Sequence, residues 1–312
     1  MQLNMGPNAE QRLNGNVEDG AEKFYVKQDG DDHVKVWAPD LGVDESHAQS
    51  YEAYDLIIAQ GGEFNDVIDV SGVTDTGIRF EIEGGTGNDE IYIGAGPAVV
   101  QGNTGNDIIE GGADDDIIYG NEGNDTIKGK GGDDILFGDE GSVTDKIVSA
   151  SIGDDGDDII EGGTGLDLIF GGGGADTLKG DGDADLVIGD GGRVIFENED
   201  GTADEDIHKL DLDENNEIDL DANVTDSGVE IDDGSRVKVL GTEFGDGGSD
   251  ILSGGSGPDI LYGGAANDDI FGQGEDDLIF GGMGFDTVRG GGGNDTVSGG
   301  SDGDTLFGFS DN

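Results

Sequence analysis

Short apolar runs recur every nine residues along much of this chain, and a glycine-rich, acidic stretch separates each run from the next. Examples are DIIE at Asp107, DIIY at Asp116 and DILF at Asp134. Branched aliphatic residues favour a short strand, and glycine permits the backbone conformations of a tight turn. The pattern therefore predicts an all-β chain in which turns and three-residue strands alternate.

The runs belong to nonapeptide repeats that form three arrays. The first array is GNTGNDIIE, GGADDDIIY, GNEGNDTIK and GKGGDDILF from Gly102; the second is GDDGDDIIE, GGTGLDLIF, GGGGADTLK and GDGDADLVI from Gly153; the third is GDGGSDILS, GGSGPDILY, GGAANDDIF, GQGEDDLIF, GGMGFDTVR, GGGGNDTVS and GGSDGDTLF from Gly245. Degenerate copies precede them at Gly61 and Gly84, and the next nine residues keep the phase but place Ala98 at position six. Every other copy has aspartate there.

A turn followed by a short strand makes half of a coil, so two repeats would close one coil of a parallel solenoid. The aliphatic side chains at position eight, such as Ile109, Ile118 and Ile127, would then point inward and stack. So thin a core cannot offset the conformational entropy that the ordered glycines lose. We infer that the aspartates supply the remaining stabilisation, because carboxylates and exposed backbone carbonyls are hard oxygen ligands suited to Ca²⁺.

The charge of the chain agrees with a need for cations. Its 312 residues include 64 glycines, 73 acidic residues, 14 basic residues and no cysteine, which gives a formal net charge of −59. Nucleic acid and anionic membranes are therefore excluded as expected partners, since both need a basic surface. Low-complexity disorder is the alternative interpretation. It does not explain a strict nine-residue register.

The consensus G-G-x-G-x-D-x-U-x, in which U is aliphatic, resembles the calcium-binding repeat of the RTX proteins, also called the hemolysin-type calcium-binding repeat. The arrays carry this resemblance over a little under half of the chain. The resemblance implies a parallel β-roll or β-helix solenoid in which several Ca²⁺ ions lie between successive turns at each edge. It also implies a chain that is unfolded where calcium is scarce and folds outside the cell.

In the RTX family the metal is held by position-six aspartates and by backbone carbonyls of the turns. The matching aspartates are Asp66, Asp89, Asp107, Asp116, Asp125, Asp134, Asp158, Asp167, Asp176, Asp185, Asp250, Asp259, Asp268, Asp277, Asp286, Asp295 and Asp304. The matching turn carbonyls include those of Gly102, Gly111, Gly120, Gly162, Gly171, Gly180, Gly254, Gly263, Gly272, Gly281 and Gly290.

The segments between the arrays alternate in hydropathy, which predicts hairpin insertions. Candidate hairpins are KFYVKQDGDDHVKVW from Lys23, IHKLDLDENNEIDL from Ile207 and VEIDDGSRVKVL from Val229. The expected organisation is a β-rich N-terminal capping region (1–60), a first roll (61–141), a linker (142–152), a second roll (153–192), a β-hairpin insertion (193–244) and a third roll (245–312).

Positions seven and nine should face outward, and in each array one of the two sheets then has an apolar outer face. Phe137, Phe170 and Phe280 are among the residues on that face. An apolar face of this size is expected to be covered. We expect these faces to pack on one another or on the inserted segments, and lateral association between chains is the alternative.

The N-terminal sequence MQLNMGPNAEQRLNG lacks the apolar region of a secretory signal peptide, and no run of eighteen apolar residues occurs. RTX proteins are typically exported by type I secretion through a C-terminal signal. The chain stops at GFSDN, in what resembles the opening of another repeat. We therefore expect an extracellular segment of a large bacterial secreted repeat protein.

The expected function is a calcium-folded structural or adhesive module of a secreted or cell-surface RTX protein. Its expected partners are calcium and, through the apolar faces, other copies of the chain or cell-surface or matrix molecules. The alternative is the non-catalytic RTX region of a type I-secreted enzyme or toxin. An ice-binding adhesin region is less favoured because Thr86, Thr104 and Thr164 do not make a row. We expect no catalysis within these residues.

Overall fold

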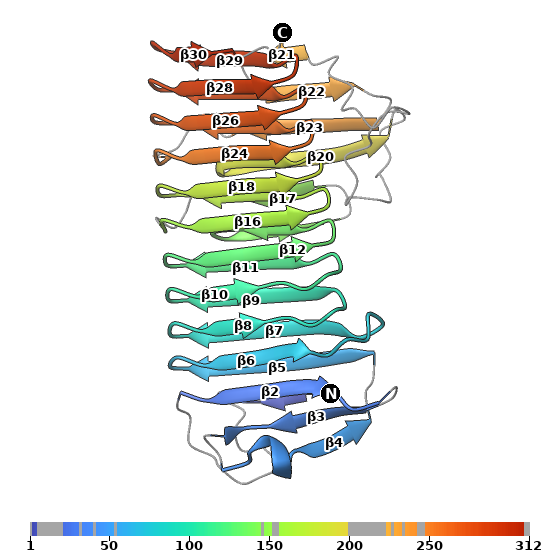
Figure 1. Cartoon of the computed structure of the whole chain (residues 1–312). Coiled ribbons are helices and arrows are strands. Elements are labelled where there is room, and N and C mark those ends of the chain that lie inside the picture. The colour runs from blue at the N-terminus through green and yellow to red at the C-terminus, as the bar shows by residue number, and fades with distance from the viewer. Residues whose placement is uncertain are drawn as a thin grey trace.

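The computed structural model describes residues 2–4, 21–30, 33–39, 42–52, 55–144, 147–151, 156–198, 223–225, 228–232, 235–241 and 247–308. Two long sheets, referred to below as the first and the second sheet, face each other along the molecule (Figure 1). Successive repeats alternate between them, so two repeats complete one coil and the coils stack into a β-roll. The all-β solenoid expected from the nine-residue period is confirmed.

The first sheet contains eleven strands in the described residues. In spatial order they are β1 (Gln2–Asn4), β5 (Leu56–Glu63), β7 (Arg79–Thr86), β9 (Ala98–Thr104), β11 (Ile117–Glu122), β13 (Ile135–Phe137), β17 (Leu168–Gly172), β19 (Leu186–Asp190), β25 (Ile260–Gly264), β27 (Leu278–Met283) and β29 (Thr296–Ser301). Each strand pairs with its neighbours in parallel.

The second sheet begins with an antiparallel cap and continues as a parallel stack. In spatial order the described strands are β4 (Gln49–Glu52), β3 (His33–Trp37), β2 (Lys23–Gln28), β6 (Val67–Gly72), β8 (Glu90–Tyr92), β10 (Ile108–Glu110), β12 (Thr126–Gly131), β16 (Ile159–Thr164), β18 (Thr177–Gly182), β24 (Ile251–Ser256), β26 (Asp269–Gly274), β28 (Thr287–Gly292) and β30 (Thr305–Phe307). The hairpin expected from Lys23 is the antiparallel pair of β2 and β3.

The three arrays form one continuous roll. Thr126 of β12 pairs with Ile159 of β16, which joins the first array to the second in the second sheet. Leu186 of β19 pairs with Ile260 of β25, which joins the second array to the third in the first sheet. The register therefore passes through both interruptions of the sequence repeat without a change of phase.

The interior of the roll is a stack of position-eight aliphatic side chains from both sheets. Ile109, Ile118, Ile127 and Leu136 have no exposed surface, as expected. Because each coil contributes only two such residues, this interior is narrow. Residues Glu45–His47 form a 3-10 helix, and no helix in the described part of the chain is long and apolar enough to cross a membrane.

A third sheet, here called the inserted sheet, is built from the segments between the arrays and lies alongside the roll (Figure 1). Its described strands are, in spatial order, β14 (Gly141–Val143), β15 (Ile147–Ala150), β20 (Gly192–Asn198), β23 (Ser235–Gly241), β22 (Gly228–Asp232) and β21 (Asn223–Thr225). The hairpin expected from Val229 is the antiparallel pair of β22 and β23. The hairpin expected from Ile207 lies outside the described residues.

The inserted sheet covers the apolar outer face of the first sheet. Val148 of β15 and Val194 of β20 belong to the same buried cluster as Phe137 and Phe170. Phe170 stacks on Phe137, and Phe137 stacks on Tyr119, with centroid separations of 5.2 and 4.8 Å. Of the expected arrangements, packing on the inserted segments is confirmed. Packing of the faces on one another is wrong, because the arrays stack end to end and their faces lie side by side in one sheet.

The outer face of the second sheet is mixed in character. Glu161 lies between Lys128 and Lys179 and forms ion pairs with both, at 3.0 and 2.8 Å. Further along, Arg289 lies over the rings of Phe271 and Phe307. Polar and charged side chains keep much of this face compatible with water.

Candidate functional site

The position-six aspartates align in two columns, one along each edge of the roll, and each aspartate immediately precedes a strand. The column that leads into the second sheet, here the long ladder, is Asp66, Asp89, Asp107, Asp125, Asp158, Asp176, Asp250, Asp268, Asp286 and Asp304. The column that leads into the first sheet, here the short ladder, is Asp116, Asp134, Asp167, Asp185, Asp259, Asp277 and Asp295.

Hydrogen bonds join the members of each ladder. The backbone N–H of each aspartate, except the last in each ladder, donates to Oδ1 of the aspartate in the next coil, at 2.7 to 3.3 Å. The long ladder starts from the N–H of Glu22 and the short ladder from the N–H of Ala98. One carboxylate oxygen of each aspartate is thus used to fix its side chain against the neighbouring coil.

The second carboxylate oxygen of most ladder members is buried and has no hydrogen-bond partner among the described residues. These Oδ2 atoms belong to Asp89, Asp107, Asp125, Asp134, Asp167, Asp176, Asp185, Asp250, Asp259, Asp268, Asp277 and Asp286. A buried carboxylate oxygen without a donor is costly, and native structures contain few of them. Because the arrangement repeats at successive coils, these oxygens are expected to share one type of binding partner.

Backbone oxygens gather at the same places. A methyl group added to the Cα of Gly84 would lie 2.6 Å from Oδ2 of Asp89 and 2.8 Å from the carbonyl oxygen of Gly102 in the next coil. The same combination of a carboxylate and a carbonyl oxygen faces Gly102, Gly111, Gly120, Gly162, Gly171, Gly180, Gly254, Gly263, Gly272 and Gly281. Gly290, in the last complete coil, faces Oδ2 of Asp295.

This geometry explains glycine at position one, where a side chain would fill the space in front of the oxygens. Positive φ occurs instead at positions two and four, for example at Gly163 (φ 126°) and Gly165 (φ 120°). Glycine at position one therefore serves close approach, and glycine at positions two and four serves the turn. The sequence pattern alone had suggested only the second role.

The oxygens fit a hard cation such as Ca²⁺, which takes carboxylate and carbonyl ligands. No group of three or more His, Cys, Asp or Glu side chains that could hold a metal occurs in the described part of the chain. A site of this kind would therefore rely on backbone carbonyls as well as on carboxylates. The glycine-rich turns expose such carbonyls at every coil.

Burial raises the pKa of most ladder carboxyls above the ordinary value for aspartate. Desolvation is the main cause, and it raises the pKa of Asp107 to about 7 and that of Asp125 to about 8. In the middle of the short ladder the pKa of Asp185 rises to about 10, because the charge of Asp167 adds to desolvation. Without a cation, the folded roll therefore holds protons on groups that are ionised in the unfolded chain at neutral pH.

Asp116 differs from the other ladder members. Its Oδ2 accepts a hydrogen bond from the backbone N–H of Gly112 in its own turn, at 2.7 Å. The coil before it has Ala98 in place of an aspartate. At this level the carboxylate has a backbone partner for each oxygen, and the arrangement is the least suited to a metal.

Two turns of the long ladder are split by the insertions. Gly138 faces Oδ2 of Asp158, and Gly189 faces Oδ2 of Asp250, in the way that Gly84 faces Asp89. These glycines thus occupy position one of the turns that the sequence had assigned to Gly153 and Gly245, two residues that lie outside the described part of the chain.

The split turns also contain buried aspartates that the sequence pattern did not identify. Asp139 is 1% exposed and Asp190 is 3% exposed. Oδ2 of Asp139 accepts from the N–H of Gly173, and Oδ2 of Asp190 accepts from the N–H of Ala265, both at 2.6 Å. The motifs GDEG and GDGG, which end the first two arrays, were the available signal.

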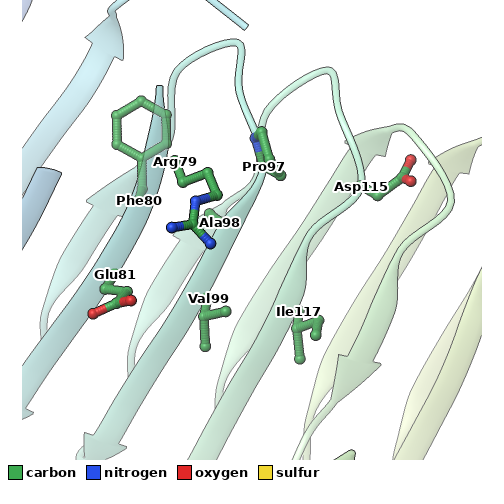
Figure 2. A pocket seen from close by; sticks show the side chains of 8 residues that line it. All are labelled: Arg79, Phe80, Glu81, Pro97, Ala98, Val99, Asp115 and Ile117. Atoms are coloured by element: carbon green, nitrogen blue, oxygen red, sulfur yellow. The ribbon is translucent and has the colours of Figure 1, made fainter. Parts of the chain in front are cut away.

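Apart from the ladders, the first sheet has a hollow of about 270 Å³ on its outer side (Figure 2). Its lining residues are Arg79, Phe80, Glu81, Pro97, Ala98, Val99, Asp115 and Ile117. Figure 2 shows Glu81, Val99 and Ile117 on neighbouring strands, with Arg79 extending towards Ala98. The lining combines one arginine and two carboxylates with apolar side chains, and it includes no ladder aspartate.

Comparison with known families gives one result. The model of the RTX calcium-binding nonapeptide repeat, in four copies, matches residues 92–127, 115–144, 152–187, 244–279 and 271–306. These matches fall on the coils that form the two ladders. No curated protein matches the sequence.

Proposed function

Since the chain is an RTX-repeat protein, we propose that it is an extracellular, calcium-folded structural module of a secreted or cell-surface protein. Its repeats are calcium-binding repeats by family. The finer proposal is that Ca²⁺ ions bind along both aspartate ladders and that their binding drives folding.

The observation that carries this proposal is the series of buried, unpartnered Oδ2 atoms that face glycine carbonyls. At one level, Asp107 and the carbonyl of Gly120 would hold the ion, with Gly102 leaving space for it. A bound calcium ion supplies two positive charges to oxygens that have no other donor. The equivalent groups at the other levels of the two ladders would hold further ions.

Coupling of binding to folding follows from the same geometry. Ladder carboxylates come together only when the coils stack, because each Oδ1 accepts from the preceding coil. Closing the roll without cations would bury many like charges in a chain of net charge −59. Binding free energy therefore contributes directly to folding free energy. Extracellular calcium modules bind with dissociation constants of roughly 10⁻⁴ to 10⁻³ M, which suits a chain that folds only after export.

A structural role is supported by the use of the buried polar groups. The buried aspartates lie in the ladders and the split turns, where their carboxylates accept hydrogen bonds from the backbone of neighbouring coils. We accordingly assign no catalytic step to the chain. We propose that its function depends on folding of the roll, in which the turns become ordered, the carboxylates align and the strands pair.

We further propose that the module is adhesive, and the outer face of the second sheet supports this role. Ile108, Thr126, Ile159, Thr177 and Ile251 follow one another in register across neighbouring strands. The three isoleucines are between 41 and 48% exposed. A regular row of branched side chains on a parallel sheet offers a contact surface to a partner.

A calcium titration followed by circular dichroism tests the proposal. Protein prepared with chelator is titrated with calcium, and magnesium at matched ionic strength is the control. A cooperative gain of β-structure with calcium alone is the expected result. An equal response to magnesium, or no response to either ion, would overturn the calcium-dependent folding proposed here.

A further inference from the structure

Asp190 has a carboxylate oxygen that the roll itself does not use. The residue directly follows Gly189 at the second split turn, before the chain leaves the roll to build the inserted sheet. Its side chain is 3% exposed. Oδ2 accepts from the N–H of Ala265, and the backbone N–H of Gly248 also lowers the pKa of this carboxyl, whereas Oδ1 is buried and makes no hydrogen bond of normal distance and angle among the described residues.

The carboxylate of Asp190 takes the place of a backbone carbonyl. In unsplit turns the carbonyl oxygen at position two lies against the position-two glycine of the next coil, as the carbonyl of Gly264 lies against Gly282. At the split turn Oδ2 of Asp190 lies against Gly264 in the same manner. Asp139 has this relation to Gly172 at the other split turn. Because a carboxylate has two oxygens and a carbonyl one, this replacement brings an additional oxygen into the turn.

The residue that carries the additional oxygen directly follows a glycine of a ladder site. Gly189, the residue before Asp190, faces Oδ2 of Asp250 and the carbonyl oxygen of Gly263. Oδ2 of Asp250 is buried and unpartnered. The charge of Asp190 also raises the pKa of Asp250, after the larger effect of desolvation, which agrees with their proximity.

We propose that Oδ1 of Asp190 is a further ligand of the calcium ion held at this split turn with Asp250. The inference rests on the proposed function, because it extends the ladder site by one residue. The ion would then bind residues on both sides of the insertion. Calcium binding at this site would hold together the two ends of the segment that forms part of the inserted sheet. A proton on Asp190 is the competing occupant, and the experiment separates the two.

Crystals of the chain grown with calcium, and their anomalous difference maps, provide the test. The expected result is an ion within about 2.3 to 2.6 Å of Asp190 and Asp250, the usual range of calcium to oxygen distances. Ions along both ladders, with none in contact with Asp190, would overturn this inference and leave the proposed function intact. Ladders without any ion would overturn both.

Asp190→Asn adds a functional test. The amide can still accept from Ala265, but it loses the charge and presents an NH₂ group in place of one oxygen. Asp181→Asn is the matched control, since Asp181 is an exposed position-two aspartate in an unsplit turn. We expect Asp190→Asn to need about tenfold more calcium to fold than the control, because ligand charge sets calcium affinity. Equal calcium requirements of the two variants, or failure of Asp190→Asn to fold at any calcium concentration, would contradict a ligand role.

Discussion

The backbone N–H of Asp125 donates to Oδ1 of Asp158 at 2.7 Å, although the chain between them leaves the roll to form β14 and β15. The bond joins the same two kinds of atom, at the same length, as the bond from the N–H of Asp107 to Oδ1 of Asp125 within an uninterrupted array. The long ladder therefore joins coils that the sequence separates, and the junction depends on the aspartate of the split turn.

Asp158→Ala should accordingly destabilise the junction between the first and second arrays. The change removes a buried acceptor and leaves the N–H of Asp125 without its partner, which costs about 1 to 3 kcal/mol before any loss of calcium. Urea denaturation at saturating calcium measures the effect. Asp304→Ala, at the half-buried end of the same ladder, is the control and should cost less. Equal losses in the two variants would show that the junction has no special dependence on Asp158.

The nine-residue period was sufficient to predict the solenoid and the alignment of its aspartates. Two repeats make one coil, so residues such as Asp107 and Asp125 must fall at the same edge, and Ile109 and Ile127 must fall in the same interior row. These relations depend only on spacing along the chain. No knowledge of distant contacts is needed to derive them.

The split turns could not be predicted in this way. Gly138 and Asp158 complete one turn, but an insertion separates them, so no contiguous nonapeptide contains both. A nonapeptide that looks complete begins at Gly153, so the sequence alone places position one of this turn there and not at Gly138. The cover of the first sheet was equally inaccessible in detail, because Val148 and Val194 reach Phe170 only through the pairing of β15 with β20.

Gly84→Ala should weaken calcium-dependent folding, although position one does not have positive φ. The new methyl group would lie 2.6 Å from Oδ2 of Asp89, so the carboxylate and the coil around it must shift. Overpacking of this kind costs about 1 to 3 kcal/mol. Gly274→Ala is the matched control, since its methyl group would meet nothing closer than the carbonyl oxygen of Gly255 at 3.7 Å. Thermal unfolding with calcium should separate the variants, and a control as unstable as Gly84→Ala would refute the close-approach argument.

Phe170→Ser should uncouple the inserted sheet from the roll. Phe170 is fully buried between the first sheet and its cover, so the change removes a large apolar contact and leaves a polar group in its place. Truncation of a buried phenylalanine costs about 3 to 5 kcal/mol. Phe285→Ser, at a side chain that is 66% exposed, should cost little. Hydrogen exchange measured by mass spectrometry should show faster exchange in β15 and β20 of the Phe170 variant, and unchanged exchange there would mean that the cover does not depend on this ring.

The metal-free chain should gain structure as the pH falls. Burial raises the pKa of Asp125 to about 8 and that of Asp134 to about 9 in the folded roll, whereas the ordinary pKa of an aspartate carboxyl is 3.8. A group whose pKa is higher in the folded state favours folding below its unfolded pKa, and this contribution is lost as the pH rises through the folded pKa. Protons thus replace part of what calcium supplies, and the gain should appear between about pH 9 and pH 4.

Circular dichroism in the presence of chelator tests this dependence, with β-structure expected to increase between pH 8 and pH 5. With calcium present, the same decrease in pH should raise the calcium concentration needed for folding, because protons and the metal compete for one set of oxygens. If lower pH favours folding in chelator but opposes folding at limiting calcium, protons and calcium bind the same buried carboxylates. A chelated chain that stays without β-structure at pH 5 would show that neutralising the ladders is not sufficient, and that the cation must also bridge carboxylates such as Asp125 to backbone carbonyls.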